Sequence, residues 1–143
     1  MRLLGVDVGR ARTGLALSDP HGVSCSPLPA IEERDPGRTI EKLAAVVSKE
    51  QVGLVVVGLP RPLSGRTNEQ AELVSLFVER LRAALTVPVV TWDERYTSKL
   101  AEAKGVTKPS RRRRVSLDSV AACYILQDYL DWLRNRSQTQ GAG

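Results

Sequence analysis

The sequence of 143 residues contains few of the residue types that mark several common protein classes. Its only histidine, His21, stands in a Pro-His-Gly turn, so a histidine-rich metal site is excluded. The two cysteines, Cys25 and Cys123, are far apart and show no Cys-x-x-Cys spacing. This pattern argues against a disulfide scaffold or a zinc site, and we interpret both cysteines as small packing residues.

Long apolar runs are also absent. None approaches the roughly 20 residues needed to cross a bilayer, and the N-terminus lacks the features of a secretory signal. We therefore expect a cytoplasmic protein without a membrane partner. The length predicts one domain over residues 1–134, with a flexible polar tail over 135–143, and is too short for a two-domain kinase-type ATPase.

The order of apolar runs and turn residues predicts an α/β fold. Two strands, 3–8 and 14–18, form a hairpin, and a weaker edge strand over 23–31 contains two prolines. Asp35-Pro36 begins a helix, and Thr67 caps another in a capping box. The remaining elements are strands at 53–57 and 87–92 and helices at 98–103 and 116–133. A right-handed crossover makes the later strands parallel, which predicts a mixed five-stranded sheet flanked by helices.

Positive charge is concentrated in one segment. The net charge is +5, but residues 104–114, here called the basic loop, carry six cations and no acid. Without this loop the chain has a net charge of −1. A concentrated cationic loop favours a polyanionic partner such as nucleic acid; the alternative is a solvated loop that is basic for solubility. Aromatic residues make up only 4%, so base stacking is not evident, with Tyr96 the one candidate.

Three carboxylates stand at positions that suggest a common site. Asp7 interrupts an apolar strand, Glu94 follows the end of another strand, and Asp118 lies in the first turn of the last helix. In open α/β sheets the functional crevice lies at the carboxyl ends of the parallel strands. Three acids gathered there require a cation, and Mg²⁺ or Mn²⁺ prefers such oxygen ligands. Two such ions would suit phosphodiester cleavage.

Each acid also has a structural interpretation. Asp7 could pair with Arg10 or Arg12, Glu94 could be a turn residue beside Arg95, and Asp118 could stabilise a helix N-terminus. These alternatives remain open for each residue alone.

Four motifs together resemble a known family. Asp7-Val8-Gly9 with Gly14-Leu15-Ala16 resembles the first-strand motif of RNase H-like proteins. That motif, the segments 56–60 and 93–98, and Asp118-Ser119-Val120-Ala121-Ala122 resemble the YqgF family of bacterial nucleases, over about residues 3–133. The resemblance implies an RNase H-like fold and a divalent-metal site in which the acids are Asp7, Glu94 and Asp118.

The resemblance further implies processing of the 5′ end of precursor 16S ribosomal RNA. Alternatives are a Holliday-junction resolvase acting on DNA four-way junctions and a non-catalytic nucleic-acid-binding factor. Structured RNA or branched DNA is therefore the expected partner of a monomer or homodimer. The cations expected to hold its backbone are Arg10, Arg12, Arg66, Arg95, Lys108, Arg111, Arg112, Arg113 and Arg114.

Overall fold

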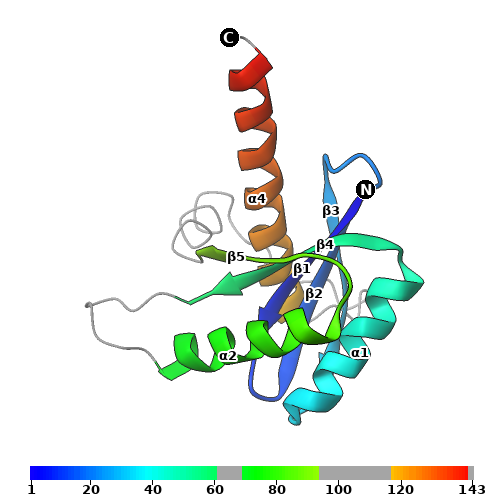
Figure 1. Ribbon diagram of the computed structural model, residues 1–143, viewed down its shortest axis with the longest axis vertical. Coiled ribbons are helices and arrows are strands. Elements are labelled where there is room, and N and C mark those ends of the chain that lie inside the picture. Colours follow the sequence, from blue (N-terminus) through cyan, green and yellow to red (C-terminus); the bar gives the residue numbers. More distant parts are fainter. Residues whose placement is uncertain (61–68, 94–116, 142–143) are drawn as a thin grey trace.

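The computed structural model describes residues 1–60, 69–93 and 117–141, which form a five-stranded sheet with helices on both faces (Figure 1). The strands lie in the order β3-β2-β1-β4-β5. The elements are β1 (Arg2–Val8), β2 (Arg12–Ser18), β3 (Cys25–Glu32), α1 (Pro36–Lys49), β4 (Val52–Leu59), α2 (Glu69–Ala84), β5 (Val89–Asp93) and α4 (Leu117–Gly141).

The pairing of the strands confirms the predicted mixed sheet. β2 is antiparallel to both β1 and β3, whereas β4 is parallel to β1 and to β5. β3 lies at the edge of the sheet. Pro27 and Pro29 have no backbone N–H to donate to a neighbouring strand, and an edge strand tolerates this because one of its sides has no partner strand. The predicted start of α1 is also confirmed, because the Asp35 carboxylate accepts a hydrogen bond from the backbone N–H of Arg38 at 2.9 Å. The predicted cap at Thr67 and the helix at 98–103 lie outside the described residues.

Side chains of the central strands alternate between two cores. Leu4 and Val6 of β1 belong to the larger core, which α1 and α2 cover. Leu3 of β1 and Val56 of β4 belong to the second core, which α4 covers. This alternation follows from the two-residue period of a strand, and it determines which residues of β1 face α4.

Helix α4 approaches β1 closely because β1 has a glycine beneath it. A Cβ atom at Gly5 would lie 2.8 Å from the carbonyl oxygen of Ala122 and 2.8 Å from Cβ of Leu126. Both distances are shorter than ordinary contacts, so only glycine fits between the strand and the helix in this arrangement.

Helix α4 is longer than the sequence analysis predicts. It continues to Gly141, and its C-terminal part extends away from the sheet (Figure 1). The predicted end near Leu133 is wrong because no glycine or proline interrupts residues 134–140. The division into a domain over 1–134 and a flexible tail over 135–143 stays a prediction. None of the described helices, α4 included, has a stretch apolar enough to span a bilayer.

We expect Gly5→Ala to lower the free energy of unfolding by about 1–3 kcal/mol, because the added methyl group would push α4 away from the sheet. Urea denaturation followed by circular dichroism measures this change. Gly37→Ala in the first turn of α1 is the control. A Cβ there would lie 3.3 Å or more from the nearest atoms, which are side-chain ends. The control should leave stability unchanged or raise it by up to about 1 kcal/mol. Equal stability of Gly5→Ala and the natural chain would contradict the argument.

Candidate metal and nucleic-acid site

Asp7 lies near the carboxyl end of β1, on the face that α4 covers. Leu3 belongs to the core beneath α4 and Gly5 contacts that helix, so Asp7, two residues further along the strand, faces the same side. The residue is half-buried. In the sheet Asp7 pairs with Gly14 of β2, and Gly14 in turn contacts the first turn of α4.

Gly14 brings the start of α4 next to Asp7. A Cβ atom at Gly14 would overlap the backbone carbonyl group of Asp118 and would lie 2.6 Å from the backbone nitrogen of Ser119. The helix can occupy this place only because residue 14 has no side chain. Since Gly14 is the sheet partner of Asp7, Asp118 and Asp7 occupy neighbouring positions on two different elements.

Ser119 fastens this end of the helix to the sheet. Its side chain is fully buried, and its hydroxyl oxygen accepts a hydrogen bond of 3.2 Å from the backbone N–H of Leu15. The pairing of β2 with β3 shifts register between Thr13 and Leu15, so the ladder is irregular at this point. The serine thus supplies a buried strand N–H with an acceptor and fixes the turn that carries Asp118.

The carboxyl end of β5 lies at the same edge of the sheet as that of β1. Val6 of β1 pairs with Val57 of β4, and Val57 pairs with Thr91 of β5. Three parallel strands therefore run toward this edge together. Asp93 is the last residue of β5. Glu94 follows it in the sequence but lies outside the described residues.

An aromatic cluster holds the end of β5 against α4. The indole N–H of Trp92 donates a hydrogen bond of 2.7 Å to the Asp128 carboxylate. The Trp92 ring meets that of Tyr129 edge to face at 5.5 Å, and Trp132 lies 5.6 Å from it. The strand that leads to Glu94 is thus fixed on the helix that carries Asp118.

Two of the nine cations predicted to bind the nucleic-acid backbone lie within the described residues, and seven lie outside them. Arg10 and Arg12 belong to the described residues and are exposed. The Nε atom of Arg12 lies 3.7 Å from the carboxylate of Glu32. The predicted phosphate-binding cations that lie outside the described residues are Arg66, Arg95, Lys108, Arg111, Arg112, Arg113 and Arg114.

A cavity of about 510 Å³ lies near the same end of the sheet but on its other face. It is bounded by α1 and α2 and lined by Val8, Thr13 and Phe77, among others. Thr13 is adjacent in sequence to Gly14, and successive residues of a strand face opposite sides of the sheet, so Thr13 faces away from α4, which packs on Gly14. The cavity is therefore separated by the sheet from Asp7, and we do not assign the acids to it.

The donor chemistry of the two described acids fits a hard divalent cation. Asp7 and Asp118 supply carboxylate oxygens, which Mg²⁺ and Mn²⁺ prefer as ligands. Within residues 1–60, 69–93 and 117–141, no group of three histidine, cysteine, aspartate or glutamate side chains could hold a metal ion. A metal site built on these two acids would therefore need a further ligand from outside the described residues.

Three features of the site were missed by the sequence analysis. These are the close approach at Gly14, the hydroxyl contact of Ser119, and the Trp92–Asp128 hydrogen bond. Gly14 and Ser119 stand within motifs that the analysis selected, but their role depends on which helix packs on which strand. The sequence did contain a signal for the role of Trp92, because this large aromatic residue stands immediately before the acids Asp93 and Glu94.

Comparisons with known structures support the fold. T. thermophilus RuvC in complex with a Holliday junction substrate matches with a TM-score of 0.59 at 16% identity, over 91% of this chain and 93% of that chain. The fowlpox virus resolvase in complex with Holliday junction DNA matches with a TM-score of 0.55 at 10% identity, over 93% and 99%. At these identities the likeness concerns the fold, and it confirms the expected RNase H-like architecture.

Comparisons of sequence identify the family. A protein of Desulforudis audaxviator (strain MP104C) named "Putative pre-16S rRNA nuclease" is 41% identical over 133 residues, which cover 92% of this chain and 94% of the relative. A protein of the same name from Chloroflexus aggregans (strain MD-66 / DSM 9485) is 43% identical over 137 residues, covering 93% and 95%. A family model described as "RuvX: Holliday junction resolvase" matches residues 1–132. The resemblance drawn from the four motifs is confirmed, and the chain belongs to the RuvX (YqgF) family.

Proposed function

We propose that this protein is a divalent-metal-dependent nuclease that hydrolyses phosphodiester bonds. Its metal-binding catalytic residues would be Asp7, Glu94 and Asp118. The observation that carries the proposal is the packing of the first turn of α4 on Gly14, which puts Asp118 beside Asp7. Membership of the RuvX family agrees with it.

Each acid has a separate support for its role. Asp7 belongs to the central strand β1 and pairs with Gly14 of β2, while the residue before it, Val6, pairs with Val57 of β4. Asp118 stands in the first turn of a helix, where the partial positive charge of the helix N-terminus offsets some of the repulsion between neighbouring carboxylates. Glu94 follows the end of β5, at the edge where β1 also ends. It is therefore our choice for the further ligand.

A Mg²⁺ or Mn²⁺ ion held by these oxygens would supply Lewis acidity to phosphodiester hydrolysis. The chain's own part is to hold the carboxylates in fixed positions and to bind the nucleic-acid backbone. Arg10 lies in the turn that joins β1 to β2 and Arg12 begins β2, three and five residues after Asp7 in the sequence. Together with the basic loop, they would bind phosphates without reading the base sequence.

The substrate that we favour is precursor 16S ribosomal RNA near its 5′ end, which the name of the relatives indicates. This substrate agrees with a cytoplasmic location. A second candidate is the DNA four-way junction, which the description of the family model favours. Paired nicks in a junction require two sites in a dimer, so a protein that stays monomeric at working concentration would count against the second candidate.

We expect Asp7→Asn, Glu94→Gln and Asp118→Asn each to lower kcat by about 100-fold or more, because each removes a ligand charge worth several kcal/mol in the transition state. Cleavage of a labelled precursor RNA and of a four-way DNA junction, with Mg²⁺ or Mn²⁺, measures the effect and separates the two substrates. Glu72→Gln is the matched control, since Glu72 is exposed on α2.

Full cleavage by Asp7→Asn would contradict the catalytic assignment. A natural chain that binds both nucleic acids but cleaves neither, at any divalent-ion concentration, would instead identify a binding factor.

We expect Ser119→Ala to lower the free energy of unfolding by about 1–3 kcal/mol, because the buried N–H of Leu15 loses its serine acceptor. The loosened first turn of α4 should also raise the Mg²⁺ concentration needed for half-maximal cleavage. Urea denaturation and a Mg²⁺ titration measure the two effects. Ser75→Ala, at an exposed position of α2, should change neither. An unchanged stability of Ser119→Ala would show that the hydrogen bond does not hold the helix.

We expect the double variant Arg111→Ala/Arg112→Ala to bind RNA and DNA more weakly at low salt. The slope of log K against log salt concentration should fall in magnitude by roughly 1.5, since each phosphate contact contributes about 0.7–0.9. Fluorescence anisotropy at several salt concentrations gives the slope. The control is Arg34→Ala/Arg80→Ala, which removes the same charge from the cavity bounded by α1 and α2. Equal slopes for the two double variants would exclude a special role for the basic loop.

A further inference from the structure

The two cysteines, which the sequence analysis treats as separate packing residues, are in direct contact. Cys25 begins β3, and Cys123 lies in α4, 98 residues later. Their sulfur atoms are 3.0 Å apart, and both side chains are half-buried thiols without a disulfide between them. The only two cysteines of the chain therefore meet where an edge strand packs on the helix that carries Asp118.

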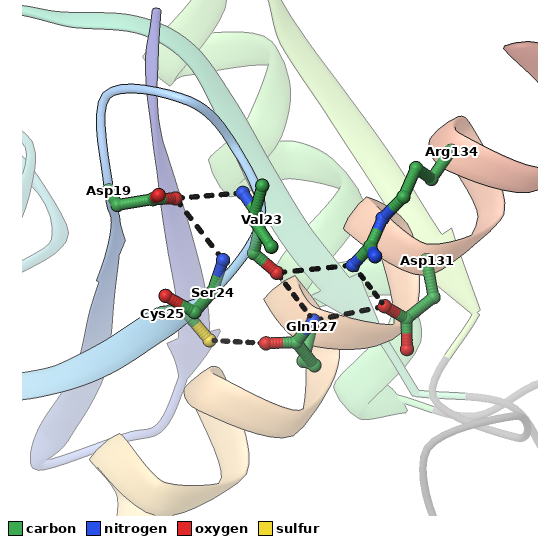
Figure 2. A network of polar contacts seen from close by, with 7 residues as sticks. All are labelled: Asp19, Val23, Ser24, Cys25, Gln127, Asp131 and Arg134. Carbon is green, nitrogen blue, oxygen red and sulfur yellow. Dashed lines mark hydrogen bonds and ion pairs between the residues drawn. The ribbon is translucent and has the colours of Figure 1, made fainter.

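Neighbouring groups hold the two thiols toward each other. The Cys25 thiol lies 3.2 Å from the carbonyl oxygen of Cys123, and the Cys123 thiol lies 3.6 Å from the carbonyl oxygen of Cys25. One helical turn further on, Gln127 places its amide oxygen 3.7 Å from the Cys25 sulfur (Figure 2). Its amide nitrogen donates to the carbonyl oxygen of Val23 at 3.1 Å. Gln127 therefore connects the helix to the segment that leads into β3.

The turn that precedes Cys25 is also held in place. The Asp19 carboxylate accepts hydrogen bonds from the backbone N–H groups of Val23 and Ser24, at 2.7 and 3.1 Å (Figure 2). These bonds lower the pKa of Asp19 below its usual value, the bond from Val23 most strongly. On the helix side, Asp131 accepts from Gln127 at 3.0 Å. The sulfur contact is thus built between two segments that polar contacts fix.

The contact gives the two thiols different chemistry. Either sulfur can donate the hydrogen bond between the two thiols. With Cys25 as the donor, this bond stabilises the thiolate of Cys123 and lowers the pKa of Cys123. The same bond, together with burial, raises the pKa of Cys25. With this donor, Cys123 is the attacking thiolate of the pair, and Cys25 lies in contact with the sulfur that it would attack next.

We propose that Cys25 and Cys123 form a redox-active dithiol, a modification site that is oxidised to an intramolecular disulfide by a low-molecular-weight disulfide such as oxidised glutathione. In the first step the Cys123 thiolate attacks one sulfur of the oxidant, the S–S bond of the oxidant breaks, and one glutathione thiolate leaves and takes up a proton. In the second step Cys25 loses its proton and attacks the Cys123 sulfur, which releases the second glutathione. Two electrons pass from the protein to the oxidant.

The geometry favours this second step over a lasting mixed disulfide. Two groups held in contact react with effective concentrations far above those of any reagent in solution. The Cys123 adduct is therefore resolved by Cys25 before a further glutathione can act on it. The resulting disulfide joins edge strand β3 to α4 and closes a loop between residues that are 98 positions apart. A cross-link that closes so long a loop lowers the conformational entropy of the unfolded state strongly.

The test uses the full chain equilibrated with mixtures of reduced and oxidised glutathione, then trapped with acid and measured by intact mass spectrometry. We expect a monomer that has lost the mass of two hydrogen atoms and that resists alkylation until it is reduced. Since the chain has only two cysteines, such a monomer identifies the bond. The oxidised protein should also melt about 5–15 °C higher than the reduced protein. Cys25→Ser should accumulate a glutathione adduct on Cys123, and Cys123→Ser should react more slowly.

Three results would overturn the proposal. They are a stable glutathione adduct on the natural chain, a disulfide between two chains, and a mass that oxidation does not change. The natural chain alone supplies these results, so a variant that fails to fold does not weaken the test. The proposal is independent of the nuclease function, because neither the mass nor the melting temperature depends on cleavage.

Discussion

The close approach of α4 to β1 and β2 is the constraint on which the rest of the structure depends. Two glycines on one face of the hairpin, Gly5 and Gly14, leave no room for a side chain between sheet and helix. The second of them determines where the helix begins, so the residues of its first turn reach the carboxyl end of β1. Had either position carried a methyl group, α4 would lie further out and Asp118 would be separated from Asp7. The sheet alone supplies one acid, and the helix brings the second.

This arrangement also resolves an electrostatic problem. Outside the basic loop the chain has a net charge of −1, so the rest of the chain would offset little of the repulsion between the proposed carboxylate ligands. In the proposed site, the N-terminus of α4 would be a local source of positive potential beside Asp118. A divalent cation would complete the balance, and a polyanionic substrate would then need the concentrated charge of the loop. The distribution of charge and the position of the acids therefore support the same function.

The sequence predicts those features that local patterns determine. The apolar strand with one acid, the proline-bearing edge strand and the Asp35 cap all express short-range preferences, and the structure shows each of them. Contacts between distant segments have no such signal. The contact between Cys25 and Cys123 forms only because β3 packs on α4, which no local pattern predicts. The contacts among Trp92, Tyr129 and Trp132 likewise depend on the packing of β5 against α4. The roles of Glu94 and the basic loop rest on chain order and composition, because these residues lie outside the described part of the chain.

Helix α4 combines these contacts because its rows of side chains face different strands. Asp118, Ala122 and Leu126, spaced four residues apart, meet β1 and β2, whereas Cys123 and Gln127 form the neighbouring row against β3 and the turn before it. Asp128, Tyr129 and Trp132 meet the end of β5. No residue from 118 to 131 is fully exposed, so this part of the helix has no wholly polar face, as expected of a helix packed on most of its circumference. Cys123 is five residues from Asp118, about 140° around the helix. A disulfide there would restrain the helix that carries Asp118 while remaining outside the proposed metal site.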